Sequence, residues 1–72
     1  MKYYSVDRKM NKFRDFIRGE MKRQKLSQEE VSYRLGIERV CLTNRLAGKT
    51  DFSMREVVML SEILEFSLGD WE

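Results

Sequence analysis

The chain has 72 residues, of which 42% are apolar and 36% are charged, and its formal net charge is +2. This length supports one small domain, and the apolar share is too high for a disordered protein. The chain contains no histidine and one cysteine, which excludes an internal disulfide and removes the commonest catalytic base and metal ligand. Apolar runs are only a few residues long, so we expect neither a transmembrane span nor a signal peptide, and a cytoplasmic protein.

Charge is distributed unevenly along the sequence. Residues 1–50 hold 13 Lys and Arg against 6 Asp and Glu, a balance of +7, whereas residues 51–72 hold 1 Arg against 6 acids, a balance of −5. A basic region of this kind favours a polyanion as the binding partner. Uneven charge also arises by chance in small proteins, so this pattern does not decide the function by itself.

Residues 1–9 (MKYYSVDRK) show no helical periodicity. We predict that they form a flexible N-terminal arm and that residues 10–72 form a single domain. The arm could follow the backbone of a polyanion or exchange onto a second copy of the chain. Its basic and aromatic residues are Lys2, Tyr3, Tyr4, Arg8 and Lys9.

A first helix is predicted from about residue 8 to Gln24, because apolar residues recur at spacings of three and four. Arg14, Arg18 and Lys22 fall on a neighbouring face of this helix, and we expect them to form a solvated flank. The residues of the apolar face are Met10, Phe13, Phe16, Ile17 and Met21.

A second helix is predicted from Gln28 to about Leu35. Ser27 precedes it and Glu30 follows three residues later, which is the spacing of a capping box, where each side chain bonds the backbone N–H of the other residue. Gly36 is expected to end the helix, because glycine readily adopts the left-handed conformation found after helix C-termini.

A third helix is predicted from about Glu38 to Ala47, with Gly48 as its terminator. Only a few residues separate the second and third helices, so their axes should cross steeply. Apolar residues are expected to fill the angle between the two helices, which leaves the opposite face of the third helix pointing outward. These bracing residues are Leu35, Ile37 and Leu42.

A fourth helix is predicted after Ser53, which is spaced to form a second capping box with Glu56. Its broad apolar face is expected to be mostly buried and consists of Val57, Val58, Leu60, Ile63 and Leu64. A short fifth helical turn could begin at Ser67. The apolar residues near this end, which offer a surface for self-association, are Phe66, Leu68 and Trp71.

The segment LSQEEVSYRLGIERVCLTNRLAGKT, residues 26–50, contains the ordered elements of a helix-turn-helix. These are a Leu-Ser-Gln opening, a small residue within the second helix, a Leu-Gly turn, a third helix and a closing Gly-Lys. In this order and spacing they resemble the helix-turn-helix of the Cro/repressor (XRE-type) family of phage and bacterial transcription regulators. The segment FSMREVVMLSEILEFSLGDW resembles the fourth and fifth helices of the family, so the resemblance covers about residues 10–71.

The resemblance implies an all-α fold, a compact domain of four to five helices with a helix-turn-helix similar to that of lambda repressor. It implies a sequence-specific transcriptional regulator, such as a phage or mobile-element repressor, that binds double-stranded DNA as a homodimer and associates with the nucleoid. The third helix, residues 38–47, would enter the major groove, and the two such helices of a dimer would lie about 34 Å apart. Neither a cofactor nor a small-molecule ligand is expected.

The resemblance also implies which residues contact DNA. The residues that match base-contacting positions are Arg39, Val40, Thr43 and Asn44. The residues that match phosphate-contacting positions, or lie beside them, are Gln28, Arg45, Lys49 and Thr50. The chemistry is suitable, because arginine pairs with guanine, asparagine pairs with adenine, and apolar side chains pack on the thymine methyl group. The simpler alternative for each residue is exposure to solvent without contact to DNA.

Three positions depart from the family pattern. Glu38 stands where Ser or Thr usually caps the recognition helix, and its charge would be repelled by phosphate. Ser32 stands in place of the commoner alanine, which is a minor change. Arg45 occupies a position that is apolar in many relatives, where Leu46 could supply the packing instead.

Two other classes of function fit parts of the sequence. An enzyme is disfavoured, because histidine is absent and Cys41 is expected to be a small packed residue. The Gly-Lys-Thr of residues 48–50 also lacks the upstream glycine of a phosphate-binding loop. A protein-binding module or inhibitor that uses the helix-turn-helix fold without acting on DNA stays open, because Glu38 and the acidic last part of the chain favour it.

Overall fold

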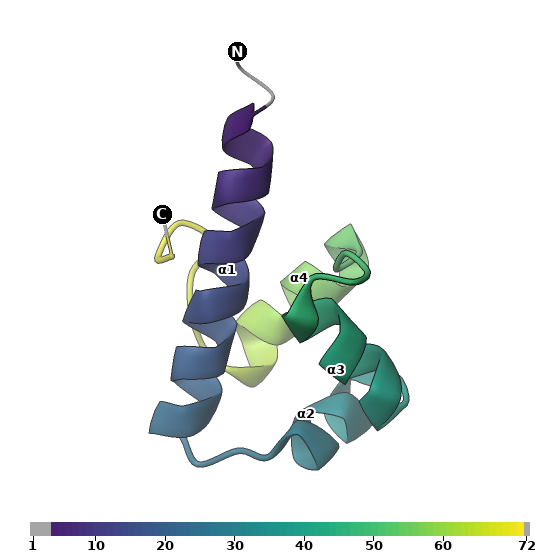
Figure 1. Cartoon of the computed structure of the whole chain (residues 1–72). Helices are drawn as coiled ribbons and strands as arrows, with labels where there is room; N and C mark the ends of the chain where they lie inside the picture. The colour runs from purple at the N-terminus through teal and green to yellow at the C-terminus, as the bar shows by residue number, and fades with distance from the viewer. Residues whose placement is uncertain (1–3, 72) are drawn as a thin grey trace.

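Four α-helices form the regular structure of residues 4–71, the part of the chain that the computed structural model describes, with side chains described for residues 7–71 (Figure 1). The helices are α1 (Tyr4–Arg23), α2 (Gln28–Leu35), α3 (Arg39–Ala47) and α4 (Met54–Ile63). This range contains no strand. The radius of gyration is 11.8 Å, close to the value of about 11 Å expected for a folded chain of this length. The prediction of a compact all-α domain is confirmed.

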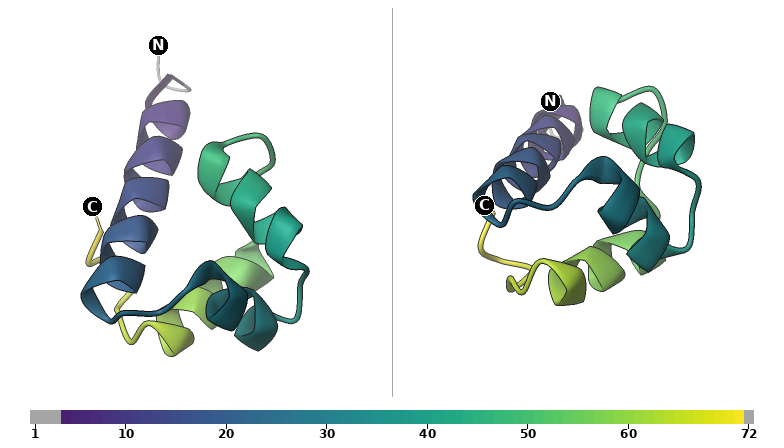
Figure 2. Two further views of the ribbon diagram at one scale, coloured as in Figure 1. Left: turned by 60° about the horizontal axis from the view of Figure 1, so that its bottom comes forward. Right: turned by 90° about the horizontal axis from the view of Figure 1, so that it is seen from below.

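Helix α3 packs against both α1 and α2, and α2 also packs against α4. Figure 2 shows α1 and α3 side by side, with the short turn of residues 36–38 joining α2 to α3. The first turns of α1 extend beyond the other three helices (Figures 1 and 2). Helix α3 is therefore held from two sides, by the long first helix and by the helix that precedes it.

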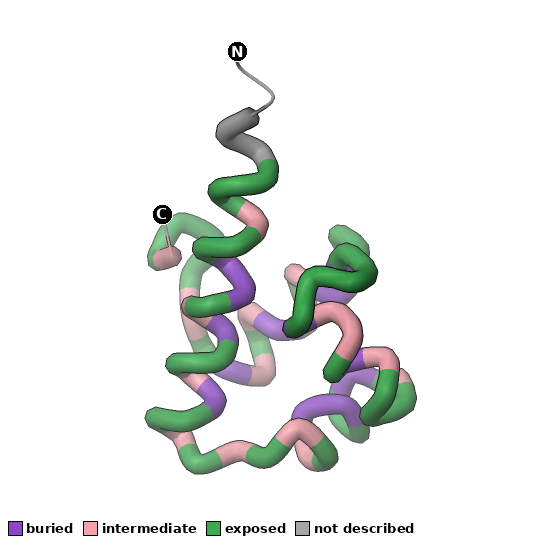
Figure 3. The backbone as a smooth tube through the Cα atoms, viewed as in Figure 1, coloured by how far each residue is buried: buried purple, intermediate pink, exposed green. Residues whose placement is uncertain are grey.

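Helix α1 begins at Tyr4, so the predicted helix start near residue 8 is wrong, and residues 4–9 of the predicted arm are helical. The apolar periodicity fails there because these turns extend beyond the core, and residues 7–9 are exposed (Figure 3). No glycine or proline interrupts the chain before Gly19, and Asp7 lies in the first turn, where an acidic group complements the helix dipole. Residues 1–3 of the predicted arm lie outside the described residues.

Serine side chains cap the starts of α2 and α4, as predicted. At α4 the capping box is complete, because Ser53 Oγ accepts from the Glu56 N–H at 3.1 Å and Glu56 Oε1 accepts from the Ser53 N–H at 3.0 Å. At α2, Ser27 Oγ accepts from the Glu30 N–H at 3.1 Å. The Glu30 carboxylate, however, accepts from Arg34 Nε at 2.8 Å. Within the described residues the α2 box is therefore only half formed.

The helices end in two ways. Helices α2 and α3 end at the predicted glycines, since Gly36 and Gly48 have φ angles of 77° and 84° in the left-handed region. Helices α1 and α4 are followed by Lys25 and Glu65, which adopt the same region with φ angles of 59° and 60°. This conformation costs a residue with a Cβ roughly 1–2 kcal/mol. The ends of α2 and α3 can be predicted from the sequence because a glycine follows each helix. No glycine stands at the ends of α1 and α4, so these ends cannot be predicted in this way.

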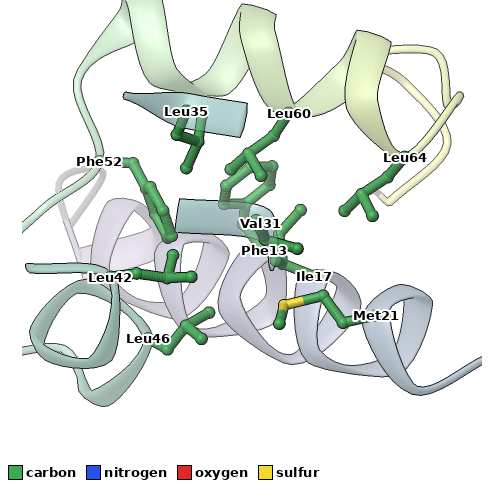
Figure 4. Packing of buried hydrophobic residues seen from close by; sticks show 10 residues of the cluster. All are labelled: Phe13, Ile17, Met21, Val31, Leu35, Leu42, Leu46, Phe52, Leu60 and Leu64. Carbon is green, nitrogen blue, oxygen red and sulfur yellow. The ribbon is translucent and has the colours of Figure 1, made fainter. Parts of the chain in front are cut away.

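The core is one cluster of apolar side chains from all four helices and from the residues on either side of α4. Figure 4 shows these side chains pointing toward one another, and Figure 3 shows the exposed residues on the outer faces. The buried members are Phe13, Ile17, Met21, Val31, Leu35, Leu42, Leu46, Phe52, Leu60 and Leu64. The predicted burial of α4 is wrong for Val58, which is 41% exposed. It lies two residues, or about 200° around the helix, from the buried Leu60.

After α4 the chain closes a turn, and no fifth helix forms within the described residues. Asp70 Oδ2 accepts from the Ser67 N–H at 2.8 Å, and the Asp70 N–H donates to the Ser67 carbonyl at 3.0 Å. Trp71 then packs edge to face on Phe13, with ring centroids 5.2 Å apart. Of the residues predicted for self-association, Trp71 therefore packs partly against the core of its own molecule, whereas Leu68 is 48% exposed.

Replacing Ser53 with alanine tests the cap of α4. The substitution removes the acceptor of the Glu56 N–H, and we expect the free energy of unfolding to fall by about 1 kcal/mol. Ser61→Ala is the matched control, because Ser61 lies inside α4 and donates to the Val58 carbonyl, and alanine has the higher helix propensity. Urea denaturation followed by circular dichroism measures both variants. Equal losses in the two variants would contradict the capping role.

Candidate nucleic-acid interface

Helix α3 presents one face to the core and the opposite face outward. Leu42 and Leu46 are buried, whereas Arg39, Val40 and Thr43 are exposed. The residues predicted to brace α3 from behind are buried or packed against the core: Leu35, Ile37 and Leu42. The predicted separation of an inner and an outer face of this helix is confirmed.

Helix α3 begins without a side-chain cap in the described range. Glu38 is its N-cap residue and has an extended backbone, but the carboxylate makes no capping hydrogen bond. Glu38 is exposed beside Arg39, and the positive end of the helix dipole offsets part of its charge. Glu38, one of the departures from the family pattern, therefore places a carboxylate at the N-terminal end of α3. The resemblance assigns contact with DNA bases to this same end.

A hydrogen bond joins α2 and α3 at the outer surface. The Thr43 hydroxyl lies 2.7 Å from Gln28 Oε1 and 3.0 Å from the Arg39 carbonyl oxygen, and it donates to one of these acceptors at a time. The structure thus brings together a predicted phosphate contact, Gln28, and a predicted base contact, Thr43. The Nε2 group of Gln28 takes no part in this bond and is a donor at the first residue of α2.

The loop after α3 folds back onto the last turn of that helix. The N–H groups of Lys49 and Thr50 lie 2.9 Å and 3.4 Å from the Asn44 carbonyl oxygen. The Lys49 and Thr50 side chains are exposed, and the Asn44 side chain is half-buried on the adjacent turn. Two predicted phosphate contacts and one predicted base contact therefore lie at one end of α3.

Two arginines of α1 hold the C-terminal end of α3. Arg14 Nε donates to the Arg45 carbonyl at 3.1 Å, and the Arg18 guanidinium donates to the Leu46 carbonyl. Carbonyls in the last turn of a helix lack intrahelical donors and carry the negative end of the dipole. Arg14 is 7% exposed, so the prediction of a solvated flank is wrong for Arg14. The prediction is confirmed for Lys22, which is exposed.

The role of Arg14 is the main feature that the sequence prediction missed. Arg14 lies four residues after Met10 and three before Ile17, so it falls inside the apolar stripe of α1 rather than beside it. An arginine at such a position needs hydrogen-bond partners, because burying a charge without them is costly. Its partners are the Arg45 carbonyl, Asn11 Oδ1 and Asp51 Oδ1.

Arg45 is paired inside the molecule with Glu56 of α4. Arg45 Nε lies 2.8 Å from Glu56 Oε1, and Nη1 donates to the carbonyl of the half-buried Cys41 at 3.1 Å. The hydrogen bond to the Glu56 carboxylate raises the pKa of Arg45 above its ordinary value and so favours the charged form. Arg45 is therefore not included among the DNA contacts proposed below. Leu46 supplies the packing, as the sequence suggested.

The described part of the chain holds no group of three or more His, Cys, Asp or Glu side chains placed to bind a metal ion. Among its helices, none combines the length and the apolar character needed to cross a bilayer. Comparison of the chain with protein-family models, with curated proteins and with solved structures finds no match. Membership of the Cro/repressor family, and the DNA contacts that it implies, therefore stay predictions from the sequence.

Breaking the Arg45–Glu56 pair from one side should destabilise the protein. In Arg45→Met the Glu56 carboxylate keeps its capping bond but loses its counter-ion at a buried position, and we expect the free energy of unfolding to fall by about 2 kcal/mol. Adding Glu56→Gln removes the uncompensated charge and retains a capping oxygen. The double variant should therefore regain a large part of the loss. Thermal denaturation measures the coupling, and purely additive effects would argue against a functioning ion pair.

Proposed function

We propose that this chain is a sequence-specific regulator of transcription that binds double-stranded DNA and uses α2 and α3 as a helix-turn-helix. In this proposal α3 enters the major groove, while Gln28, Lys49 and Thr50 contact phosphates and fix the register on the duplex. The protein acts in the cytoplasm at the nucleoid and belongs to the repressor type found in phages and mobile elements.

The observation that supports this function best is the division of α3 into two faces. Leu42 and Leu46 anchor the inner face in the core, while the outer face carries Arg39, Val40 and Thr43 in exposed positions. Readout of bases requires side chains on a rigid element, because hydrogen-bond donors must be held at a fixed geometry. A helix fixed at its back and at its C-terminal end meets that requirement.

The chemistry of the outer face suits base edges. Arg39 can donate two hydrogen bonds to O6 and N7 of guanine, Asn44 can pair with adenine, and Val40 can pack on a thymine methyl group. One bidentate pair gives about 1–3 kcal/mol of discrimination. Arg39 is exposed and Asn44 is half-buried, so Arg39 has the principal role in this proposal.

A homodimer forms part of the proposal, because one domain of this size supplies few contacts to DNA. Two copies of α3 about 34 Å apart would enter successive major grooves. Leu68, which is exposed, and Trp71, which is half-buried and three residues later in the chain, offer apolar surface for the second copy. The net charge of −5 on residues 51–72 keeps that surface away from the phosphate backbone.

A second candidate function is a protein-binding module on the same fold. It is favoured by Tyr33, which is 83% exposed on α2, because exposed aromatic side chains are enriched at protein interfaces. Glu38, exposed at the start of α3, also suits a partner other than DNA. Salt-dependent binding to duplex DNA distinguishes the two candidates, since phosphate contact is strongly sensitive to salt.

Substitutions at Lys49 and Arg39 separate phosphate contact from base readout. Lys49→Ala should weaken binding to every duplex and reduce the slope of log K against log salt by about one. Arg39→Ala should reduce the preference for the best duplex over a random one by about 1–3 kcal/mol. Fluorescence anisotropy at several salt concentrations measures both, with the best duplex obtained by selection from a random library.

Lys12→Ala is the matched control for these two variants. Lys12 is exposed on α1 and lies two residues before Arg14, on the side of the helix that faces away from α3. We expect this variant to bind DNA as the wild type does. If Lys49→Ala and Arg39→Ala also bind like the wild type, the protein-binding module becomes the better candidate.

Leu68→Glu tests the dimer surface. A carboxylate at this exposed position should convert the dimer to a monomer by opposing apolar contact with the second copy, while the circular dichroism spectrum stays unchanged. Leu68→Met keeps an apolar group and is the control, for which we expect a dimer. Sedimentation velocity measures the state of each protein. A wild-type monomer, both free and on its selected duplex, would disprove the dimer.

A further inference from the structure

The Arg14 side chain lies directly beneath the loop that follows α3. Its Nη2 group lies 3.0 Å from Asp51 Oδ1, and its Nη1 group donates to Asn11 Oδ1 at 2.7 Å. A Cβ atom at Gly48 would lie only 3.5 Å from the Arg14 guanidinium. The buried guanidinium of Arg14 therefore lies close to Gly48 and bonds Asp51, the first and the last residue of the loop formed by residues 48–51.

Asp51 is the one acidic residue in the loop sequence Gly-Lys-Thr-Asp, and its side chain is 77% exposed. It directly follows Lys49 and Thr50, the proposed phosphate contacts. Consecutive Cα atoms are about 3.8 Å apart, so a phosphate bound by these two residues lies within reach of the Asp51 charge. An uncompensated carboxylate at this place would repel the DNA backbone.

We propose that Arg14 is an internal counter-ion that allows the loop of residues 48–51 to approach DNA. By neutralising Asp51 from beneath, it acts as a positioning residue for the phosphate contacts of Lys49 and Thr50. The inference rests on the proposed function and extends it, because Arg14 lies on α1, outside the helix-turn-helix. Its side chain is 9% exposed, so it acts through Asp51 and not by touching DNA.

A purely structural role for Arg14 predicts a different result. Arg14 donates to the Arg45 carbonyl, and loss of that bond lowers stability whatever the charge of Asp51. Charge compensation instead predicts that neutralising Asp51 restores the DNA binding that Arg14→Gln loses. The double variant separates the two roles, because loss of the bond to the Arg45 carbonyl persists when Asp51 is neutral, whereas an uncompensated charge does not.

The test compares DNA binding by the wild type, Arg14→Gln, Asp51→Asn and the double variant, using a library-selected duplex and a random duplex at several salt concentrations. Arg14→Gln should bind about tenfold more weakly, with a salt slope shallower by about one, because it leaves one negative charge uncompensated at the interface. Asp51→Asn should bind several-fold more tightly. The double variant should regain the wild-type affinity and slope while keeping the lower melting temperature of Arg14→Gln.

Two controls separate this local effect from net charge and from hydrogen bonding. Arg18 and Asp15 form a more exposed pair at 2.9 Å, whose acid lies on α1 and not in the loop, so Asp15→Asn should not change DNA binding either by the wild type or by Arg18→Gln. Arg14→Lys keeps the positive charge and loses the planar set of donors. It should retain the wild-type salt slope even where its stability falls.

The outcomes distinguish the inference from the proposed function. If Asp51→Asn leaves affinity and salt slope unchanged, or if the double variant binds no better than Arg14→Gln, the inference is wrong and the proposed function stands. Asp51→Asn decides the matter even where Arg14→Gln fails to fold, because an exposed aspartate tolerates this change. If the wild type binds neither duplex, the proposed function and the inference are both wrong.

Discussion

The attachment of the C-terminal end of α3 to α1 is the interaction on which the rest of the structure depends. Helix α3 has 9 residues, and helices this short are marginal alone, so their stability comes from tertiary contacts. Its start lacks a side-chain cap within the described residues, which makes the contacts at its other end more important. Arg14 bonds the Arg45 carbonyl, which also accepts from the Gly48 N–H at 3.2 Å, and Arg18 bonds the Leu46 carbonyl. Burial of Leu42 and Leu46 completes the attachment.

The same arrangement reduces the charge that the protein can direct at a partner. The sequence contains 14 basic residues, but the guanidinium groups of Arg14 and Arg45 are bonded to carboxylates and carbonyls within the molecule. The basic part of the chain therefore presents less positive charge to a partner than the number of its basic residues suggests. A DNA interface built on α3 would depend chiefly on Arg39 and Lys49, which explains why a second subunit matters to the proposed function.

Features that depend on a few neighbouring residues can be predicted from the sequence, and those that depend on distant contacts cannot. Ser27 and Ser53 cap the starts of α2 and α4, and glycines follow the ends of α2 and α3, so these four boundaries are predicted to within one residue, as is the outward face of α3. Arg14 instead bonds groups 31 and 37 residues away, which periodicity does not report. The pairing of Arg45 with α4 likewise depends on how the helices pack, so the candidate site was only partly predictable.

The packing of Trp71 on Phe13 makes the core depend on contacts between distant parts of the sequence. Phe13 belongs to α1, whereas Trp71 follows α4. Leu60 and Leu64, which complete the core, also come late. The apolar face of α1 is therefore covered only when α4 and the segment after it pack against it. Because contacts between residues far apart in sequence must overcome loop-closure entropy before they form, they slow folding relative to a helical protein held together by local contacts.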